Sequence, residues 1–213
     1  GLEAAGVFAA CVAEAFRPGV TVVEVTKTAL KLAKDGTREA IDAACKVAHA
    51  HAGTSWSYET VVTELHEAML PYSPMGDDVR HGPDKAGVAT AAYQPSRLMS
   101  IEELPIALAF MVLNDGDFNK TIEDAVNSGR DTDSIGIMAG AILGAMAGDR
   151  VIEPSILDHL NKTNELELDK SADTFAEASA KIIDADLQSL SKRQEQLAQL
   201  LQDSSPAEKG TDK

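Results

Sequence analysis

Hydrophobic residues recur every three to four positions along most of the chain, which is the spacing of one face of an α-helix. Near the start, Val7, Cys11, Val12 and Ala15 fall on one side of such a helix. We find no internal repeat, no strand pattern and no heptads long enough for an extended coiled coil. The sequence therefore predicts an all-α fold. The predicted helices cover residues 2–16, 21–35, 37–51, 58–70, a helix ending at 113, then 118–127, 135–147, 156–160 and 172–201.

Glycine, proline and capping residues set the predicted helix ends. Gly36 is expected to end the second helix and Thr37 to cap the third. The helix that ends at Leu113 has two possible starts, either a capping box at Ser100-Ile101-Glu102-Glu103 or Pro105 as its first helical residue. The polar turn at 114–116 separates this helix from the next one.

Residues 71–96 differ from the rest of the chain because prolines alternate with glycines and no periodicity remains. Such a long segment without regular structure is unusual in a compact domain and is often functional. Within it, residues 86–92 have the composition of a short helix, and His81, Arg80 and Lys85 form a basic group that either contacts a diphosphate or is simply solvated.

The most apolar segment, residues 135–147, carries a glycine at every fourth position. Each glycine costs about 1 kcal/mol relative to alanine in a helix interior, so this spacing suggests that another helix packs closely against it. We therefore predict that 135–147 is the central buried helix and that its glycine face lies against a second helix. The glycines concerned are Gly136, Gly140, Gly144 and Gly148.

The composition and charge of the chain argue against some classes of function. The chain has 213 residues and 34 acidic against 19 basic side chains, giving a formal net charge of −15. This balance argues against nucleic-acid binding and against a polybasic membrane anchor. Hydrophobic residues make up 44% of the chain, enough for a packed core, but aromatic residues only 4%. Two cysteines are too few for a disulfide framework, and no segment is apolar for long enough to span a bilayer. We expect a cytoplasmic protein, and a monomer.

The clearest candidate for a metal-binding or catalytic site is the segment Gly129-Arg130-Asp131-Thr132-Asp133-Ser134. Two carboxylates and a hydroxyl within one turn provide hard oxygen donors of the kind that Mg²⁺ or Mn²⁺ prefers. The alternative is structural, because Asp133 or Ser134 could cap the helix that follows.

These residues, together with Met138-Ala139-Gly140-Ala141-Ile142, Gly144-Ala145 and the upstream Asp115-Gly116-Asp117-Phe118, resemble the C-terminal signature of the ADP-ribosylglycohydrolases. The resemblance covers roughly residues 1–185 and is specific at 114–148. It implies a compact orthogonal multi-helix domain and a hydrolase that cleaves a glycosidic bond to ADP-ribose with two Mg²⁺ or Mn²⁺ ions. The implied partner is an ADP-ribosylated protein or an ADP-ribosyl metabolite.

The resemblance assigns metal binding to Asp131, Asp133 and Ser134, and a catalytic role to Asp131 and Asp133. One of the two carboxylates would contact the attacking water, and the sequence does not decide which. The family's remaining ligands belong to an upstream Thr-Asp-Asp motif and an acidic residue. Asp77-Asp78 follows Gly76 and lacks that context. Since the chain starts without a methionine, we expect a C-terminal portion of a longer protein that is a poor enzyme by itself.

Three divisions of the chain are expected: a helical domain over 1–186, an amphipathic end helix over 187–201 and a disordered polar tail over 202–213. The apolar residues of the end helix suggest that it docks on the body of the protein or on a partner.

Other candidate site residues are expected to be structural: the histidines at 49, 51, 66 and 159, and the aromatic residues Trp56 and Tyr58, whose alternative role is stacking on adenine.

Two other functions remain open. One is a non-catalytic relative that binds ADP-ribose or is purely structural: the retained Asp131, Asp133 and Ser134 argue against it, and the missing upstream ligands leave it open. A phosphatase using Asp131 and Asp133 as nucleophile and acid would place them after a buried strand, whereas residues 125–128 have the pattern of a helix end.

Overall fold

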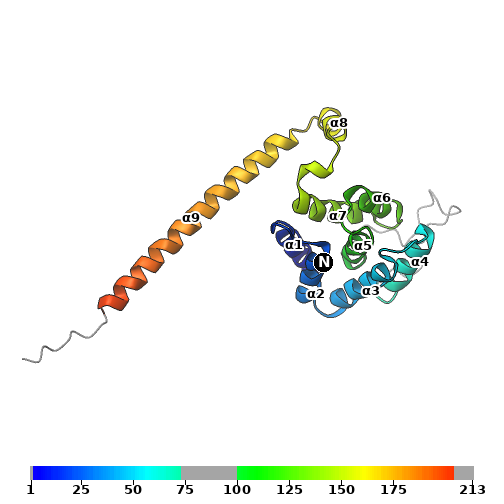
Figure 1. Cartoon of the computed structure of the whole chain (residues 1–213), viewed down its shortest axis with the longest axis horizontal. Helices are drawn as coiled ribbons and strands as arrows, with labels where there is room; N and C mark the ends of the chain where they lie inside the picture. The colour runs from blue at the N-terminus through cyan, green and yellow to red at the C-terminus, as the bar shows by residue number, and fades with distance from the viewer. Residues whose placement is uncertain (1, 73–99, 204–213) are drawn as a thin grey trace, which may run out of the picture. The chain divides into compact units, whose positions relative to one another are not determined.

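The computed structural model describes residues 2–72 and 100–203. These residues form helices and turns without any strand, which confirms the all-α prediction (Figure 1). The helices are α1 (Leu2–Ala15), α2 (Val22–Leu32), α3 (Asp35–His51), α4 (Tyr58–Met69), α5 (Ser100–Leu113), α6 (Phe118–Asn127), α7 (Thr132–Ala147), the 3₁₀ turn η4 (Asp149–Val151), α8 (Pro154–Asn164) and α9 (Leu168–Asp203).

The chain divides into two compact units, Gly1–Glu153 and Pro154–Lys213. The first unit holds α1 to α7 and η4, and the second holds α8 and α9. The expected division at residue 186 falls inside α9, which continues through it without a break.

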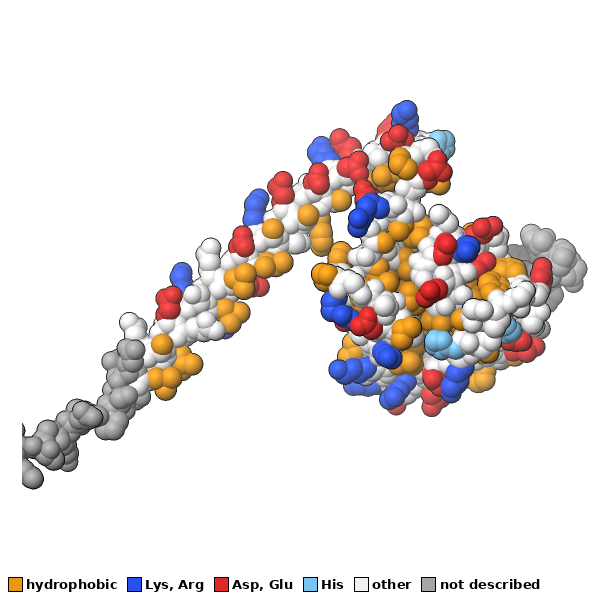
Figure 2. All heavy atoms as spheres, in the orientation of Figure 1, with side chains coloured by type: hydrophobic (Ala, Val, Ile, Leu, Met, Phe, Trp, Pro, Cys, Tyr) orange, Lys and Arg blue, Asp and Glu red, His pale blue; other side chains and the backbone are white. Residues whose placement is uncertain are grey.

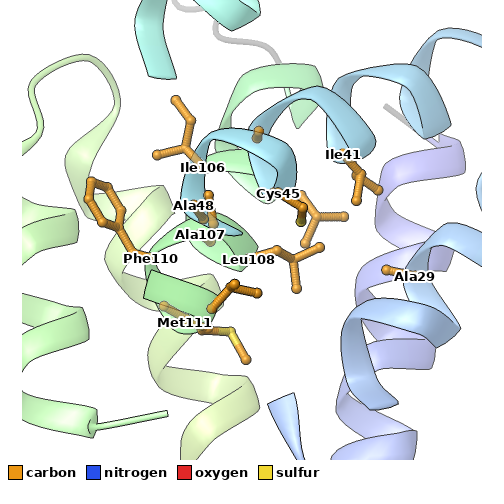
Figure 3. Close-up of a cluster of buried hydrophobic side chains, with 14 of the residues drawn as sticks. Ala29, Ile41, Cys45, Ala48, Ile106, Ala107, Leu108, Phe110 and Met111 are labelled. Carbon is orange, nitrogen blue, oxygen red and sulfur yellow. The ribbon is translucent and has the colours of Figure 1, made fainter. Parts of the chain in front are cut away.

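Helix α5 is the centre of the first unit (Figure 1). Every residue from Glu102 to Leu113 is buried, and α5 packs most extensively against α3. Figure 3 shows this contact, where Leu108 of α5 lies beside Cys45 of α3. The prediction that residues 135–147 form the central helix is therefore wrong. Helix α7 packs on α5, α6 and α1, but Ile137 on its outer side is 67% exposed.

Half of the predicted glycine face packs as expected. A Cβ atom at Gly136 would lie 3.2 Å from Cγ2 of Val126, and one at Gly140 would lie 3.3 Å from Cδ1 of Ile122, so both glycines allow close contact with α6. A Cβ atom at Gly144 would meet no heavy atom within 4 Å, and Gly148 ends α7 with a φ of +74°. The contact between α7 and α6 therefore accounts for two of the four glycines.

The start of α3 differs from the prediction because a distant residue stabilises it. Gly36 lies in the first turn of α3, and Thr37 is a buried helical residue rather than a cap. Glu3 of α1 accepts hydrogen bonds from the backbone N–H of Lys34 and from the hydroxyl of Thr37. This carboxylate of α1 therefore holds the N-cap residue and the first turn of α3 from outside the helix.

At α5 the structure decides between the two predicted helix starts in favour of the one at Ser100. Helix α5 begins at Ser100, and Pro105 lies inside it. Because proline has no N–H, the carbonyl of Ile101 loses its usual helical donor at this point. The expected short helix at 86–92 and the basic group at 80–85 lie outside the described residues.

Cys11 and Cys45 are buried free thiols. Burial raises the pKa of Cys11 to about 11 and that of Cys45 to about 12. Among the described helices, none is both long and apolar enough to cross a membrane.

Candidate active site

The turn between α6 and α7 reverses the chain with two consecutive residues in the left-handed region. Gly129 has a φ of +76° and Arg130 a φ of +67°. Such a φ costs glycine little, but it is uncommon for a residue with a side chain. The hydroxyl of Ser128 donates a hydrogen bond of 2.7 Å to the carbonyl of Ala125 and so fixes the end of α6.

The turn places the predicted trio at the start of α7. Asp131 is the N-cap residue, and its side chain makes no capping hydrogen bond. The hydroxyl of Ser134 donates a hydrogen bond of 3.1 Å to Oδ2 of Asp131. The helix begins at Thr132, three residues before the predicted start, so Asp133 and Ser134 lie in its first turn. The structure thus brings the three residues together.

Two glutamates from α5 join this cluster. Glu102 and Glu103 lie in the first turn of α5, and each residue is only 8% exposed. The carboxyl groups of Glu103 and Asp131 share a hydrogen bond, and Asp131 also shares one with Asp133. Four carboxyl groups from two helices therefore gather at this end of the first unit.

The crowding of these groups shifts their pKa values in different directions. Burial, followed by the hydrogen bond to Asp131 and the charges of Asp131, Glu102 and Asp133, raises the pKa of Glu103 to about 7. Burial and the neighbouring Asp133 also raise the pKa of Asp131. The pKa of Asp133 is lowered by its hydrogen bond with Asp131 and by backbone N–H groups at the start of α7. Asp133 therefore keeps its charge most readily.

One buried cation faces this negative charge. Nη1 of Arg130 lies 3.4 Å from Oε1 of Glu102, and their side chains are 3% and 11% exposed. Within the part of the chain that the structure describes, no group accepts a hydrogen bond from the guanidinium of Arg130. Arg130 thus offsets part of the carboxylate charge through an ion pair at a distance beyond normal hydrogen bonding.

The donor set suits a hard divalent cation but is incomplete. Carboxylate and hydroxyl oxygens are the ligands that Mg²⁺ and Mn²⁺ prefer. In the described ranges, however, no three histidine, cysteine, aspartate or glutamate side chains are arranged to hold a metal ion between them. A cation bound by Asp131 and Asp133 would complete its coordination with Ser134, with water or with residues outside these ranges.

Comparison with known proteins assigns the family. The sequence model described as ADP-ribosylglycohydrolase matches residues 1–190, which include the turn at 128–131 and both glutamates of α5. The chain belongs to the ADP-ribosylglycohydrolase family. The glycohydrolase match extends through the first unit, α8 and the first part of α9.

The relatives of this ADP-ribosylglycohydrolase chain give little further detail. It is 38% identical over 77 residues to the uncharacterized protein YegU of Escherichia coli K12. This alignment covers 36% of the chain and 23% of YegU, so the matched segment spans less than a quarter of that relative. No solved structure matches the glycohydrolase chain.

The structure gives most of the other candidate residues local contacts. His51 is paired with Glu64, with 2.7 Å between Nε2 and Oε2. The hydroxyl of Tyr58 donates a 2.9 Å hydrogen bond to the carbonyl of Asp124 and so ties α4 to α6. Trp56 packs against the core, and His159 lies within 3.5 Å of the hydroxyl of Thr163 on its own helix. His49 is exposed on α3.

The sequence analysis missed Glu102 and Glu103 as members of this carboxylate cluster. Their position was read only as the start of a helix. The available signal was two adjacent acidic residues directly before an apolar helix that is buried on all sides, where carboxylates are rare unless they have a partner or a task.

We predict that Glu103→Gln stabilises the metal-free chain at alkaline pH. The pKa of Glu103 is about 7 in the folded chain against an ordinary 4.5. The folded state therefore holds this proton more tightly than the unfolded state, and stability falls as the pH rises from about 4.5 to about 7. Glutamine resembles the protonated acid, so we expect the melting temperature at pH 8 in EDTA to rise by a few degrees.

The gain should largely disappear at pH 4, where Glu103 is mostly protonated in both states. Glu39→Gln, on the exposed surface of α3, serves as the control and should change neither melting temperature. An equal gain for Glu103→Gln at pH 4 and pH 8 would contradict the electrostatic explanation.

Proposed function

We propose that the protein containing this chain hydrolyses the glycosidic bond between ADP-ribose and a protein or small-molecule acceptor, with Mg²⁺ or Mn²⁺ bound at Asp131 and Asp133. The observation that carries the proposal is the convergence of Asp131, Asp133, Ser134 and Glu103 at one turn of a chain from the ADP-ribosylglycohydrolase family.

The different environments of the residues at the turn suit them to different roles in metal binding. Asp133 keeps its negative charge most readily and is exposed, so it is suited to a direct ionic contact with the metal. Asp131 would bind the metal through one carboxylate oxygen, while Ser134 offers its hydroxyl oxygen as a neutral ligand. A bound divalent cation supplies positive charge that lowers the pKa of a coordinated water and orients substrate hydroxyls.

The reaction itself needs a base and a stabilised cationic centre. Cleavage at the anomeric carbon passes through a transition state with oxocarbenium character, which nearby carboxylates stabilise electrostatically. Asp131 or Asp133 would accept the proton of the attacking water while the leaving group departs with the bonding electron pair. The turn is fixed by the hydrogen bonds of Ser128 and Ser134, so these carboxylates are held in place before substrate binds.

A second candidate is a relative that binds ADP-ribose without cleaving it. The incomplete set of metal-binding side chains in the described ranges favours this function for the chain alone. Under this alternative, the carboxylate cluster would bind ribose hydroxyls, and added metal would not change the rate of ADP-ribose release.

The test compares this chain with the whole protein that contains it. We expect the whole protein to release ADP-ribose from ADP-ribosylated substrates in Mg²⁺ or Mn²⁺ and to lose this activity in EDTA. The chain alone should be slower by about 10²-fold or more, because losing metal ligands removes several kcal/mol of transition-state stabilisation. Equal rates would refute the need for upstream ligands, and a metal-independent rate would refute the proposed cation.

A further inference from the structure

Within the second unit, the described residues leave one apolar face of helix α9 uncovered. Its 36 residues run from Leu168 to Asp203. Figure 2 shows apolar side chains along one edge of this helix and charged side chains along the other. Ile183, Leu187 and Leu190 are between 55% and 61% exposed, and Leu197 and Leu201 are similar. A long helix with an exposed apolar stripe is stable in water mainly when something packs on that stripe.

The spacing of this stripe indicates that another helix packs on it. From Ala176 to Leu201 its positions are separated alternately by four and three residues, a heptad repeat sustained for more than three heptads. The sequence analysis overlooked it because alanines and a glutamine occupy some of these positions. The large members are Ile183, Leu187, Leu190, Leu197 and Leu201, and Ala176, Ala180 and Gln194 complete the repeat.

We propose that α9 pairs with α9 of a second copy of this chain as an antiparallel coiled coil. In the antiparallel register centred between Gln188 and Ser189, Leu187 packs against Leu190 of the second copy. In the same register, Ala180 lies opposite Leu197 and Ala176 lies opposite Leu201. Small residues thus face large ones at both ends of the repeat, which gives layers of similar volume.

The charged residues beside the apolar stripe also favour antiparallel over parallel pairing. In the antiparallel register the flanking Asp186 lies beside Arg193 of the second copy, and the two-fold symmetry forms this ion pair twice. In a parallel dimer Asp186 would face Ser191 and Arg193 would face Ala198, so neither ion pair would form. A parallel dimer would also place Ala176 and Ala180 opposite their own copies and leave the seam underpacked. This inference is independent of the catalytic proposal and replaces the expected monomer with a dimer.

The experiment measures the mass of the full chain by sedimentation equilibrium over a range of concentrations. We expect a species with twice the mass of the 22.5 kDa chain. The double variant Leu187→Glu/Leu190→Glu places charges in the seam and should sediment as a single chain. The control Ala185→Glu/Gln188→Glu adds the same charge on the outer face of α9 and should remain a dimer. A single-chain mass for the unmodified protein at all concentrations, or a dimer that survives Leu187→Glu/Leu190→Glu, would overturn the proposal.

A charge exchange tests the direction of pairing. Arg193→Asp brings two aspartates together at each flank of the antiparallel dimer and should shift the equilibrium at least tenfold toward single chains. Adding Asp186→Arg to this variant restores opposite charges and should restore the dimer. Since Arg193 would face alanine in a parallel pair, a dimer unaffected by Arg193→Asp would refute the antiparallel arrangement. Helix content from circular dichroism shows that each variant remains folded.

Discussion

In the whole protein, Asp131→Asn is expected to lower the rate of ADP-ribose release by about 10²-fold or more, equivalent to several kcal/mol of transition-state stabilisation. Asparagine keeps the size of the side chain and still accepts the hydrogen bond from Ser134, but it lacks the charge that a hard divalent cation requires. Asp133→Asn should have a similar effect. The measurement is turnover at saturating Mg²⁺, together with the Mg²⁺-dependent rise in melting temperature.

Ser134→Ala provides the matched comparison at the same turn. It should cost less activity, because a neutral hydroxyl is a weaker ligand and water can take its place. The fold should survive both aspartate variants, since removing one carboxylate from a crowded group relieves repulsion. If the three residues served only to cap α7, Ser134→Ala and Asp133→Ala would lower the melting temperature and Asp131→Asn would change nothing. Unchanged turnover and unchanged Mg²⁺ stabilisation for Asp131→Asn would show that the metal-site proposal is wrong.

The second large effect concerns stability. Arg130→Met should lower the free energy of unfolding by about 3–5 kcal/mol, the usual cost of removing one partner from a buried ion pair. The variant leaves Glu102 without its cation beside Glu103 and Asp131. Methionine has a Cβ atom, so the φ of +67° at this position is equally unfavourable in both proteins, and the difference reports the lost charge. Urea denaturation at pH 7.5 measures it.

The double variant Glu102→Gln/Arg130→Met separates charge from packing. Because it removes both members of the pair, it should recover most of the stability lost in Arg130→Met. A single variant within about 1 kcal/mol of the unmodified chain would show that the ion pair contributes little. Failure of the double variant to recover stability would instead assign the loss to the packing of the Arg130 side chain.

Local signals predicted helices well where the residues that end them are neighbours in sequence. Helix α6 was predicted with its observed bounds, because Asp117 accepts the capping hydrogen bond from Lys120 and a polar turn precedes it. The start of α3 was missed because its donors bind Glu3, more than thirty residues away. No local pattern contains that information.

Only part of the candidate site was predicted, because only some of its residues are neighbours in sequence. Asp131, Asp133 and Ser134 are neighbours in sequence, so their spacing alone indicated a possible ligand group. Glu103 reaches Asp131 only because α5 and α7 pack together. The choice of central helix failed for a related reason: residues 135–147 and α5 are both strongly apolar, and apolar content alone does not show which of two helices is surrounded on all sides.

The central position of α5 also sets an order of events during synthesis. Helices α1 to α4 leave the ribosome before residues 100–113, although the apolar face of α3 is completed by α5. Until α5 emerges, the core that the earlier helices share with it is incomplete. Forming the contact between α3 and α5 then closes a loop that includes all of α4. The N-terminal half of this unit therefore exposes apolar surface during translation, and it is the part of the unit that a chaperone would bind.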